Sequence, residues 1–171
     1  PEHLEWSASI HAIPFKRGLT KTLVYLEKSE TDALLAAPDP RTRQGHRDGA
    51  LLLFLYNSGA RAAEAAHLVV GDLDLGPLLT VRILGKGNKM RLCPLWRSTA
   101  DALTPLVEGH DRAERVFRNQ RGEPLTRFGV RGVVRRAATQ AGQRIPSLRD
   151  KRVSPHTLRH TTAVHLLRAG V

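Results

Sequence analysis

The sequence predicts a mainly α-helical domain of the α+β kind, a helical bundle with one small antiparallel β-hairpin. Apolar residues recur at helical spacing in several segments, and one stretch alone shows the alternation expected of paired strands. The chain has 171 residues, of which 41% are hydrophobic. This length suits a single domain with a buried core.

The first three helices are predicted from capping residues and apolar spacing. Ser29 is expected to cap a short helix that ends before Pro38. A longer helix is expected over residues 43–58, because Gly59 follows it and suits the left-handed conformation in which helices often end. The alanine-rich residues 61–68 predict a third helix.

The β-hairpin is predicted over residues 79–92. Apolar and polar side chains alternate in residues 79–83 and again in residues 89–92. The sequence Gly85-Lys86-Gly87-Asn88 lies between these two runs and is typical of a tight turn.

Three more helices are expected, over residues 98–108, 126–140 and 154–169. Ser154 is a suitable N-cap for the last of them, with Pro155 at its first position. The helix that starts at Thr126 has an apolar stripe at helical spacing, which predicts a face toward the core. The stripe consists of Val130, Val133, Val134, Ala137, Ala138 and Ala141.

The charge of the chain favours a polyanionic partner. The 27 Lys and Arg residues outnumber the 16 Asp and Glu residues, so the net charge is +11, and the pI is about 11.0. Cys93 is the single cysteine, so an intrachain disulfide and an all-cysteine metal site are excluded. No apolar run approaches the ~20 residues of a membrane helix. We therefore expect a cytoplasmic, DNA-associated protein with no membrane segment.

Polar residues gather at two predicted helix starts. His156 and Arg159 share a face in the first turn of the last helix, where free backbone N–H groups favour an anion. Arg61 begins another helix, with Glu64 one turn on. Each pair could be an ordinary surface feature, a capped helix start in one case and an ion pair in the other. Together they could also clamp a phosphodiester.

Other cations allow the same two interpretations. Lys86 at the hairpin turn is either a solvated lysine or a cation that reaches a phosphate. Arg127, Arg131 and Arg135 recur at every fourth position and form either a solvated face or a row of phosphate contacts. His156 and His160 have the spacing of a metal-binding pair, but the glutamate that metalloproteases place after the first histidine is missing. We therefore expect no metal and regard a metal-dependent hydrolase as remote.

Taken together, these motifs resemble the tyrosine recombinase, or phage integrase, family. The order of the motifs and the spacing between them match the family, and the resemblance spans about residues 25–171. The motifs are Tyr56-Asn-Ser-Gly-Ala-Arg61-Ala-Ala-Glu64, Gly85-Lys86-Gly87-Asn88-Lys89 and Ser154-Pro155-His156-Thr-Leu-Arg159-His160.

The resemblance also implies a domain organisation. Residues 25–171 would form the catalytic domain, incomplete at its C-terminus. Residues 1–24, with Ile13-Pro14-Phe15-Lys16-Arg17, resemble the linker to an N-terminal DNA-clamping domain that is absent from this chain.

The family pattern implies a role for each matched residue. Arg61 and Arg159 would grip the nonbridging oxygens of the scissile phosphate. His156 would hydrogen-bond that phosphate or take the proton of the nucleophile, and Lys86 would protonate the departing 5′ oxygen. Glu64 and His160 would support these residues, without any metal or cofactor. The residues expected to contact double-stranded DNA are Lys89, Arg91, Arg127, Arg131 and Arg135.

One departure from the family concerns the nucleophile. The family uses a tyrosine downstream of the His-x-x-Arg helix, whereas the sequence ends at Val171, 12 residues after Arg159. Tyr25 and Tyr56 lie upstream, and neither matches. The full-length protein is therefore expected to recombine or integrate DNA through a 3′-phosphotyrosyl intermediate. The chain itself is expected to bind DNA without a nucleophile.

Two alternatives remain open. The first is a non-catalytic DNA-binding remnant of an integrase. The second is a type IB topoisomerase, which the short hairpin and compact domain disfavour. Family members act as tetramers on paired sites, so we expect a full-length homotetramer on DNA and a monomeric fragment.

Overall fold

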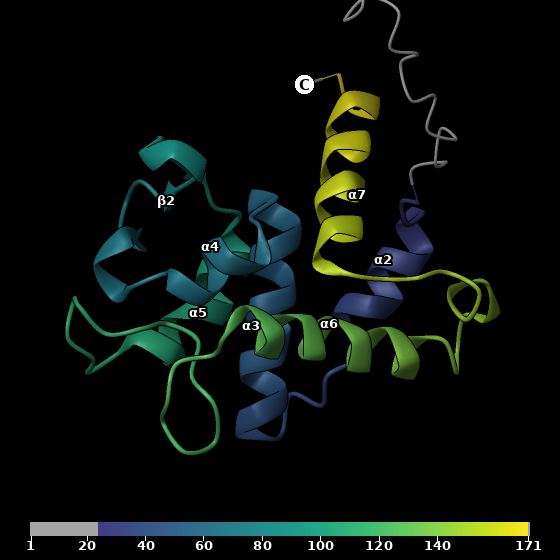
Figure 1. Cartoon of the computed structure of the whole chain (residues 1–171), viewed down its shortest axis with the longest axis horizontal. Helices are drawn as coiled ribbons and strands as arrows, with labels where there is room; N and C mark the ends of the chain where they lie inside the picture. Colours follow the sequence, from purple (N-terminus) through teal and green to yellow (C-terminus); the bar gives the residue numbers. More distant parts are fainter. Residues whose placement is uncertain (1–23, 171) are drawn as a thin grey trace, which may run out of the picture.

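The computed structural model describes residues 24–170, so residues 1–23 of the expected linker lie outside it. The chain is mainly helical, as the sequence predicted, and a small three-stranded antiparallel sheet of order β1-β2-β3 lies at one side of the helices (Figure 1). None of the described helices is long and apolar enough to cross a membrane. The helices are α2 (Lys28–Leu35), α3 (Arg43–Ser58), α4 (Ala62–His67), α5 (Arg97–Val107), α6 (Arg127–Ala141) and α7 (Pro155–Arg168). The strands are β1 (Leu73–Asp74), β2 (Thr80–Leu84) and β3 (Met90–Pro94). Three 3-10 turns cover Val70–Asp72, Lys86–Asn88 and Pro146–Leu148.

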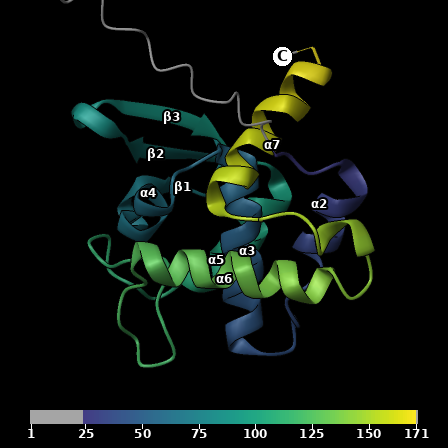
Figure 2. The same cartoon turned by 45° about the vertical axis from the view of Figure 1, so that its right-hand side comes forward.

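Helix α3 is the centre of the fold. It packs against α2, α5, α6 and α7, and in both cartoon views the other helices lie around it (Figures 1 and 2). Leu51, Phe54 and Leu55 are fully buried, and the Phe54 ring lies 5.8 Å from that of Phe117. Each such side chain contributes about 1.5–3 kcal/mol by leaving water. The apolar stripe predicted on α6 is buried against this core, except for the half-buried Ala138.

Most predicted helix boundaries are confirmed, and one cap is wrong. Thr126 and Ser154 cap α6 and α7 as expected. Helix α2 is capped by Glu27 rather than Ser29, because the backbone N–H of Glu27 donates to the Glu30 carboxylate (2.8 Å). Glu30 is buried, so its side chain is fixed well enough to hold this bond.

The hairpin is confirmed, with one strand added. Strands β2 and β3 pair antiparallel, with Leu84 opposite Met90. The chain reverses through the 3-10 turn Lys86–Asn88, where Gly87 has a φ of 73° and Asn88 of 58°. Strand β1 pairs with β2 and was not predicted, because two residues are too few to show an alternating pattern.

Helix α7 is joined to the C-terminal end of α3. The Thr162 hydroxyl donates to the Tyr56 carbonyl oxygen (2.6 Å), and the Tyr56 hydroxyl is hydrogen-bonded to His165 Nδ1 (2.7 Å). The Arg159 guanidinium donates to the Gly59 carbonyl oxygen. Gly59 itself ends α3 in the left-handed conformation predicted for it, with a φ of 58°. The turn after α3 and the first turns of α7 therefore lie together.

Two glycines of this region are expected to respond to alanine in opposite directions. Gly59→Ala should lower the free energy of unfolding by about 1–2 kcal/mol, because a left-handed φ is strained for a residue with a Cβ. Gly49→Ala, inside α3, should raise it by about 0.5–1 kcal/mol, because its Cβ would meet no atom within 4 Å. Urea denaturation of both variants checks this. Equal effects of the two substitutions would contradict it.

Candidate active site at the starts of α4 and α7

Arg61 occupies the turn between α3 and α4. It is the N-cap residue of α4, and its backbone N–H donates to Glu64 Oε2 (2.9 Å). Its guanidinium donates to the other oxygen of the same carboxylate (2.8 Å). Arg61 is exposed, with 47% of its side chain accessible, so donors remain for a ligand. Glu64 therefore holds both the backbone and the side chain of Arg61.

Glu64 also binds a second arginine. Arg91, from β3, donates to Glu64 Oε2 at 2.7 Å. The Glu64 side chain is only 6% exposed. Burial acts to raise the pKa of Glu64, but the hydrogen bonds from Arg91 and from Arg61 outweigh it and lower the pKa to about 2. Glu64 is thus a carboxylate that stays ionised and joins the hairpin to the start of α4.

Arg159 completes a cluster of cations. Its side chain comes from the first half of α7, and the Gly59 carbonyl holds it. Burial lowers the pKa of Arg159, and the charges of Arg61 and Arg91 lower it further against the opposing effect of Glu64. The charges of two other guanidinium groups thus act on Arg159, and the Glu64 carboxylate opposes them. Such an excess of positive charge is stabilised when an anion binds.

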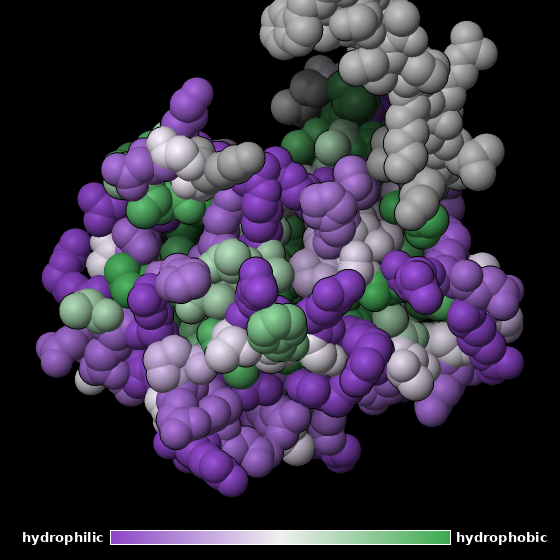
Figure 3. Space-filling model, in the orientation of Figure 1, coloured by the Kyte–Doolittle hydropathy of each residue, from purple (hydrophilic) through white to green (hydrophobic). Residues whose placement is uncertain are grey.

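A cavity of about 490 Å³ adjoins Arg61 and brings three helices together. It lies between the starts of α4, α6 and α7. Four polar side chains at its wall were singled out in the sequence, namely Arg61, Arg127, Arg131 and His156. The rest of the lining is Ala62, Ala63, Phe128, Ser154 and Pro155. The face that carries α6 is largely hydrophilic (Figure 3).

Of the remaining candidate residues, those whose side chains the structure describes do not line this cavity. His160 packs edge to face on His156, with 4.9 Å between the ring centroids. Lys89 and Arg135 are exposed and do not line the cavity. Lys86 lies in the turn of the hairpin, and the structure describes no more of it than its backbone. The preceding Gly85 borders the ion pair, since a Cβ placed there would lie 3.6 Å from Glu64 Oε1.

Neither tyrosine lines the cavity. Tyr56 is 9% exposed, and its hydroxyl is bonded to His165. The hydroxyl of Tyr25 accepts a hydrogen bond from Arg168 (2.8 Å) at the far end of α7. Among residues 24–170, no group of three or more His, Cys, Asp and Glu side chains is arranged to hold a metal ion.

The contact between Arg91 and Glu64 was missed by the sequence analysis, which assigned Arg91 to DNA binding. A signal for it was present. Arg91 is opposite Ile83 in the hairpin, and Ile83 is buried. Paired residues point to the same face of a sheet, so Arg91 had to face inward, toward the helices.

Comparison with known proteins identifies the family. Residues 24–171 match the sequence profile of the phage integrase family. The chain belongs to this family of tyrosine recombinases. It is 35% identical over 152 residues to the tyrosine recombinase XerD of Staphylococcus epidermidis, covering 85% of this chain and 49% of the relative. It is 41% identical over 174 residues to y4rC of Sinorhizobium fredii, named as a candidate integrase/recombinase, covering all of this chain and 52% of y4rC.

Solved structures agree with this assignment. The XerA recombinase has a TM-score of 0.71 and 26% identity to the chain, over 86% of this chain and 52% of XerA. XerH, solved bound to its difH substrate before cleavage, has a TM-score of 0.69 and 26% identity, over 90% of this chain and 46% of XerH. The mainly helical fold with a small sheet is therefore the tyrosine recombinase catalytic-domain fold. The chain spans about half the length of these relatives.

The Glu64 carboxylate should make stability depend on acid pH. Its pKa is lowered on folding from 4.5 to about 2, so its contribution is complete above pH 4.5 and lost as the pH falls toward 2. We expect a loss on the order of 2 kcal/mol, because the partly exposed arginines are screened by solvent. Urea denaturation between pH 7 and pH 2.5 measures it. Glu64→Gln should remove the part of the pH dependence that belongs to Glu64, while other carboxylates of lowered pKa, such as Glu30 and Asp39, keep theirs. An unchanged dependence would contradict the assignment.

Proposed function

We propose that this chain binds double-stranded DNA and forms the phosphate-binding part of the active site of a site-specific recombinase or integrase. One observation carries the proposal. Arg61 and His156, from two different helix starts, line one cavity in a chain of net charge +11. Arg159 is not part of the cavity wall, but it is bound to the carbonyl of Gly59, two residues before Arg61. A phosphodiester is the anion that this arrangement suits best, because helix N-termini and guanidinium groups both favour phosphate oxygens.

The proposed chemistry is phosphoryl transfer without a metal. Charge spreads over the equatorial oxygens in the transition state, and fixed cations stabilise it. In our proposal Arg61 and Arg159 bind the nonbridging oxygens, and His156 hydrogen-bonds the phosphate or accepts the proton of the nucleophile. Lys86 protonates the departing 5′ oxygen. Loss of one such donor typically costs about 3 kcal/mol of transition-state stabilisation.

The supporting residues have their own proposed roles. Glu64 keeps Arg61 in place through its two hydrogen bonds, and His160 supports the His156 ring by packing on it. Arg127 and Arg131 extend the cavity wall along α6, so we propose that they contact DNA phosphates on either side of the reacting one. The exposed Lys89 and Arg135, and Arg91 through its free donors, are proposed as further DNA contacts.

The nucleophile is proposed to come from outside this sequence. Tyr25 and Tyr56 are held away from the cavity by their own hydrogen bonds. We therefore propose that the chain alone binds DNA but forms no covalent bond to it. The longer protein would cleave and rejoin strands through a 3′-phosphotyrosyl intermediate as a homotetramer, with residues 1–24 as its linker and 25–171 in its catalytic domain. A covalent protein–DNA adduct formed by this chain on a suicide duplex would disprove the proposal that the chain alone forms no covalent bond to DNA.

Duplex binding by the chain should weaken steeply with salt. Each phosphate contact adds about −0.9 to the slope of log K against log [salt]. Arg131→Gln is expected to reduce the magnitude of this slope by about 1, because it removes one contact. Fluorescence anisotropy with a labelled duplex at several salt concentrations measures both quantities.

The matched control for this measurement is Arg97→Gln. Arg97 is an exposed arginine of α5 that pairs with Asp101 and does not line the cavity. Its substitution should leave the slope unchanged. A salt-independent affinity of the unsubstituted chain, or equal slopes for Arg131→Gln and Arg97→Gln, would contradict the proposed interface.

Arg159 should matter for cleavage far more than for binding. In a longer chain that includes the tyrosine, we expect Arg159→Ala to abolish strand cleavage and to reduce duplex affinity only slightly, because most binding energy comes from other phosphate contacts. Gel assays of cleavage and of binding on the same duplex separate the two effects. Retained cleavage would show that the wrong arginine has been assigned to the scissile phosphate.

A further inference from the structure

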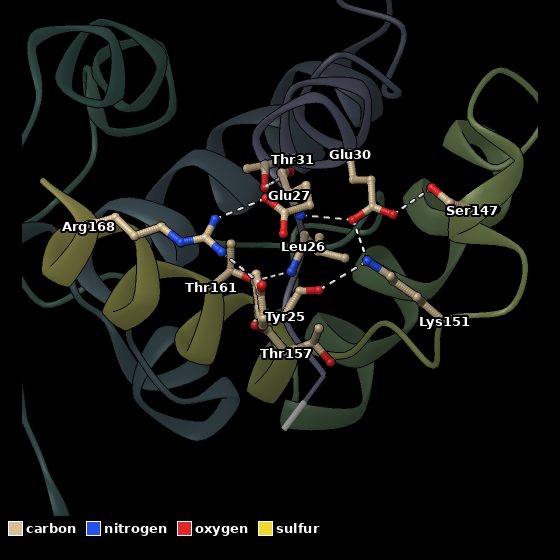
Figure 4. Close-up of polar contacts among 10 residues, drawn as sticks. All are labelled: Tyr25, Leu26, Glu27, Glu30, Thr31, Ser147, Lys151, Thr157, Thr161 and Arg168. Carbon is tan, nitrogen blue, oxygen red and sulfur yellow. Dashed lines mark hydrogen bonds and ion pairs between the residues drawn. The ribbon is translucent and has the colours of Figure 1, made fainter. Parts of the chain in front are cut away.

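A network of polar contacts joins the start of α2 and the residues before it to α7 and to the loop that precedes α7. We call residues Tyr25, Leu26, Glu27 and Glu30 the N-terminal clamp. All four are drawn in Figure 4 with the side chains that they contact on α7 and on the loop before it. None of these contacts involves the cavity wall.

The centre of the clamp is the buried carboxylate of Glu30. Its side chain is 4% exposed. One oxygen accepts from the Ser147 hydroxyl (2.6 Å), and the other accepts from Lys151 Nζ (2.6 Å) and from the backbone N–H of Glu27 (2.8 Å). Burial acts to raise the pKa of Glu30, but these hydrogen bonds outweigh it and lower the pKa. The carboxylate is therefore ionised and fully engaged.

Ser147 and Lys151 belong to the loop that leads into α7. This loop runs from the end of α6 to Ser154, the N-cap of α7. Lys151 also donates to the Tyr25 carbonyl oxygen (3.2 Å), so it is held by two groups of the clamp. His156 is the second residue of α7, two positions after Ser154. The loop that the clamp holds therefore leads directly into the first turn of α7.

The body of α7 is held from two sides. The backbone N–H of Leu26 donates to the Thr161 hydroxyl (2.9 Å), and the neighbouring Thr162 donates to the Tyr56 carbonyl. At the far end, Arg168 donates to Glu27 (3.0 Å) and to Tyr25. Arg159 lies between these attachment points. A shift of α7 along or around its axis would break contacts at both ends.

We propose that Glu30 and Lys151 are positioning residues for the phosphate site, fixing the start of α7 so that His156 and Arg159 meet Arg61. This inference rests on the proposed function of that site. A buried ion pair contributes little net stability compared with an apolar pair of the same shape. What it supplies is a unique arrangement, because a charge that shifts out of place loses its partners and becomes costly.

The test compares a variant in which Glu30 and Lys151 are both uncharged with a variant that removes a different ion pair of α2. The double variant Glu30→Gln with Lys151→Met keeps the shape and leaves no unpaired buried charge. The control is Lys28→Met with Asp32→Asn, which removes an exposed ion pair of α2. Lys151→Arg keeps the charge and should rescue the contact. Ser147→Ala breaks the network more mildly, in case the double variant fails to fold.

The readouts are the NMR signals of the His156 ring and of Arg159 Nε–Hε, recorded in this chain before and during titration with pyrophosphate. We expect both signals to shift in the double variant, and pyrophosphate binding to weaken about tenfold, as for the loss of one charge-assisted hydrogen bond. Ser147→Ala should shift the signals in the same direction by less. The control pair and Lys151→Arg should behave as the unsubstituted chain does.

The outcomes separate the inference from the function on which it rests. Unchanged signals, or unchanged pyrophosphate affinity, in the folded double variant would overturn the positioning role and leave the phosphate site standing. If pyrophosphate fails to move the His156 and Arg159 signals of the unsubstituted chain, the proposed function fails instead. In that case the positioning role is decided by whether the His156 and Arg159 signals shift in the double variant before any pyrophosphate is added.

Discussion

The left-handed turn at Gly59 is the constraint on which the site depends. It ends the central helix α3, and α4 begins two residues later with Arg61 as its N-cap. The same turn leaves the Gly59 carbonyl free of helical bonding, and Arg159 of α7 takes it as an acceptor. One backbone conformation thus brings together two arginines that are far apart in the sequence. Helix α3 supplies the rigidity for this arrangement, because its apolar residues are buried among four other helices.

The electrostatics of the site follow from that geometry. The positive charges of Arg61 and Arg91 act on Arg159, and Glu64 offsets part of this effect while it binds the other two arginines. A single carboxylate leaves an excess of positive charge next to a cavity with additional arginines on its wall. This excess is unfavourable in the free protein and favourable once a phosphate is bound. In our proposal the site is preorganised for an anion, because Glu64 holds Arg61 and the Gly59 carbonyl holds Arg159 before the ligand arrives.

Most helices and the hairpin could be predicted from the sequence, because short-range patterns of capping and apolar residues determine them. Caps and apolar spacing predicted α3, α6 and α7, and alternation predicted the hairpin. The cap of α2 was predicted wrongly because the backbone N–H of its cap residue, Glu27, donates to the carboxylate of Glu30. That carboxylate is fixed by Lys151, 121 residues from Glu30 in the chain. The bond between Arg91 and Glu64 also joins separate elements, and only strand alternation hinted at it. Long-range polar contacts of this kind depend on how elements pack, which no local pattern encodes.

A crystal structure of the chain bound to a DNA duplex would show whether Arg61 and Arg159 bind the same phosphate. We expect a backbone phosphate within hydrogen-bonding distance of both Arg61 and Arg159, with the His156 ring beside it and α6 along the neighbouring phosphates. Arg61 would keep its contact with Glu64, and Arg159 its contact with the Gly59 carbonyl. A duplex bound on another face, with no phosphate between these two arginines, would contradict this expectation.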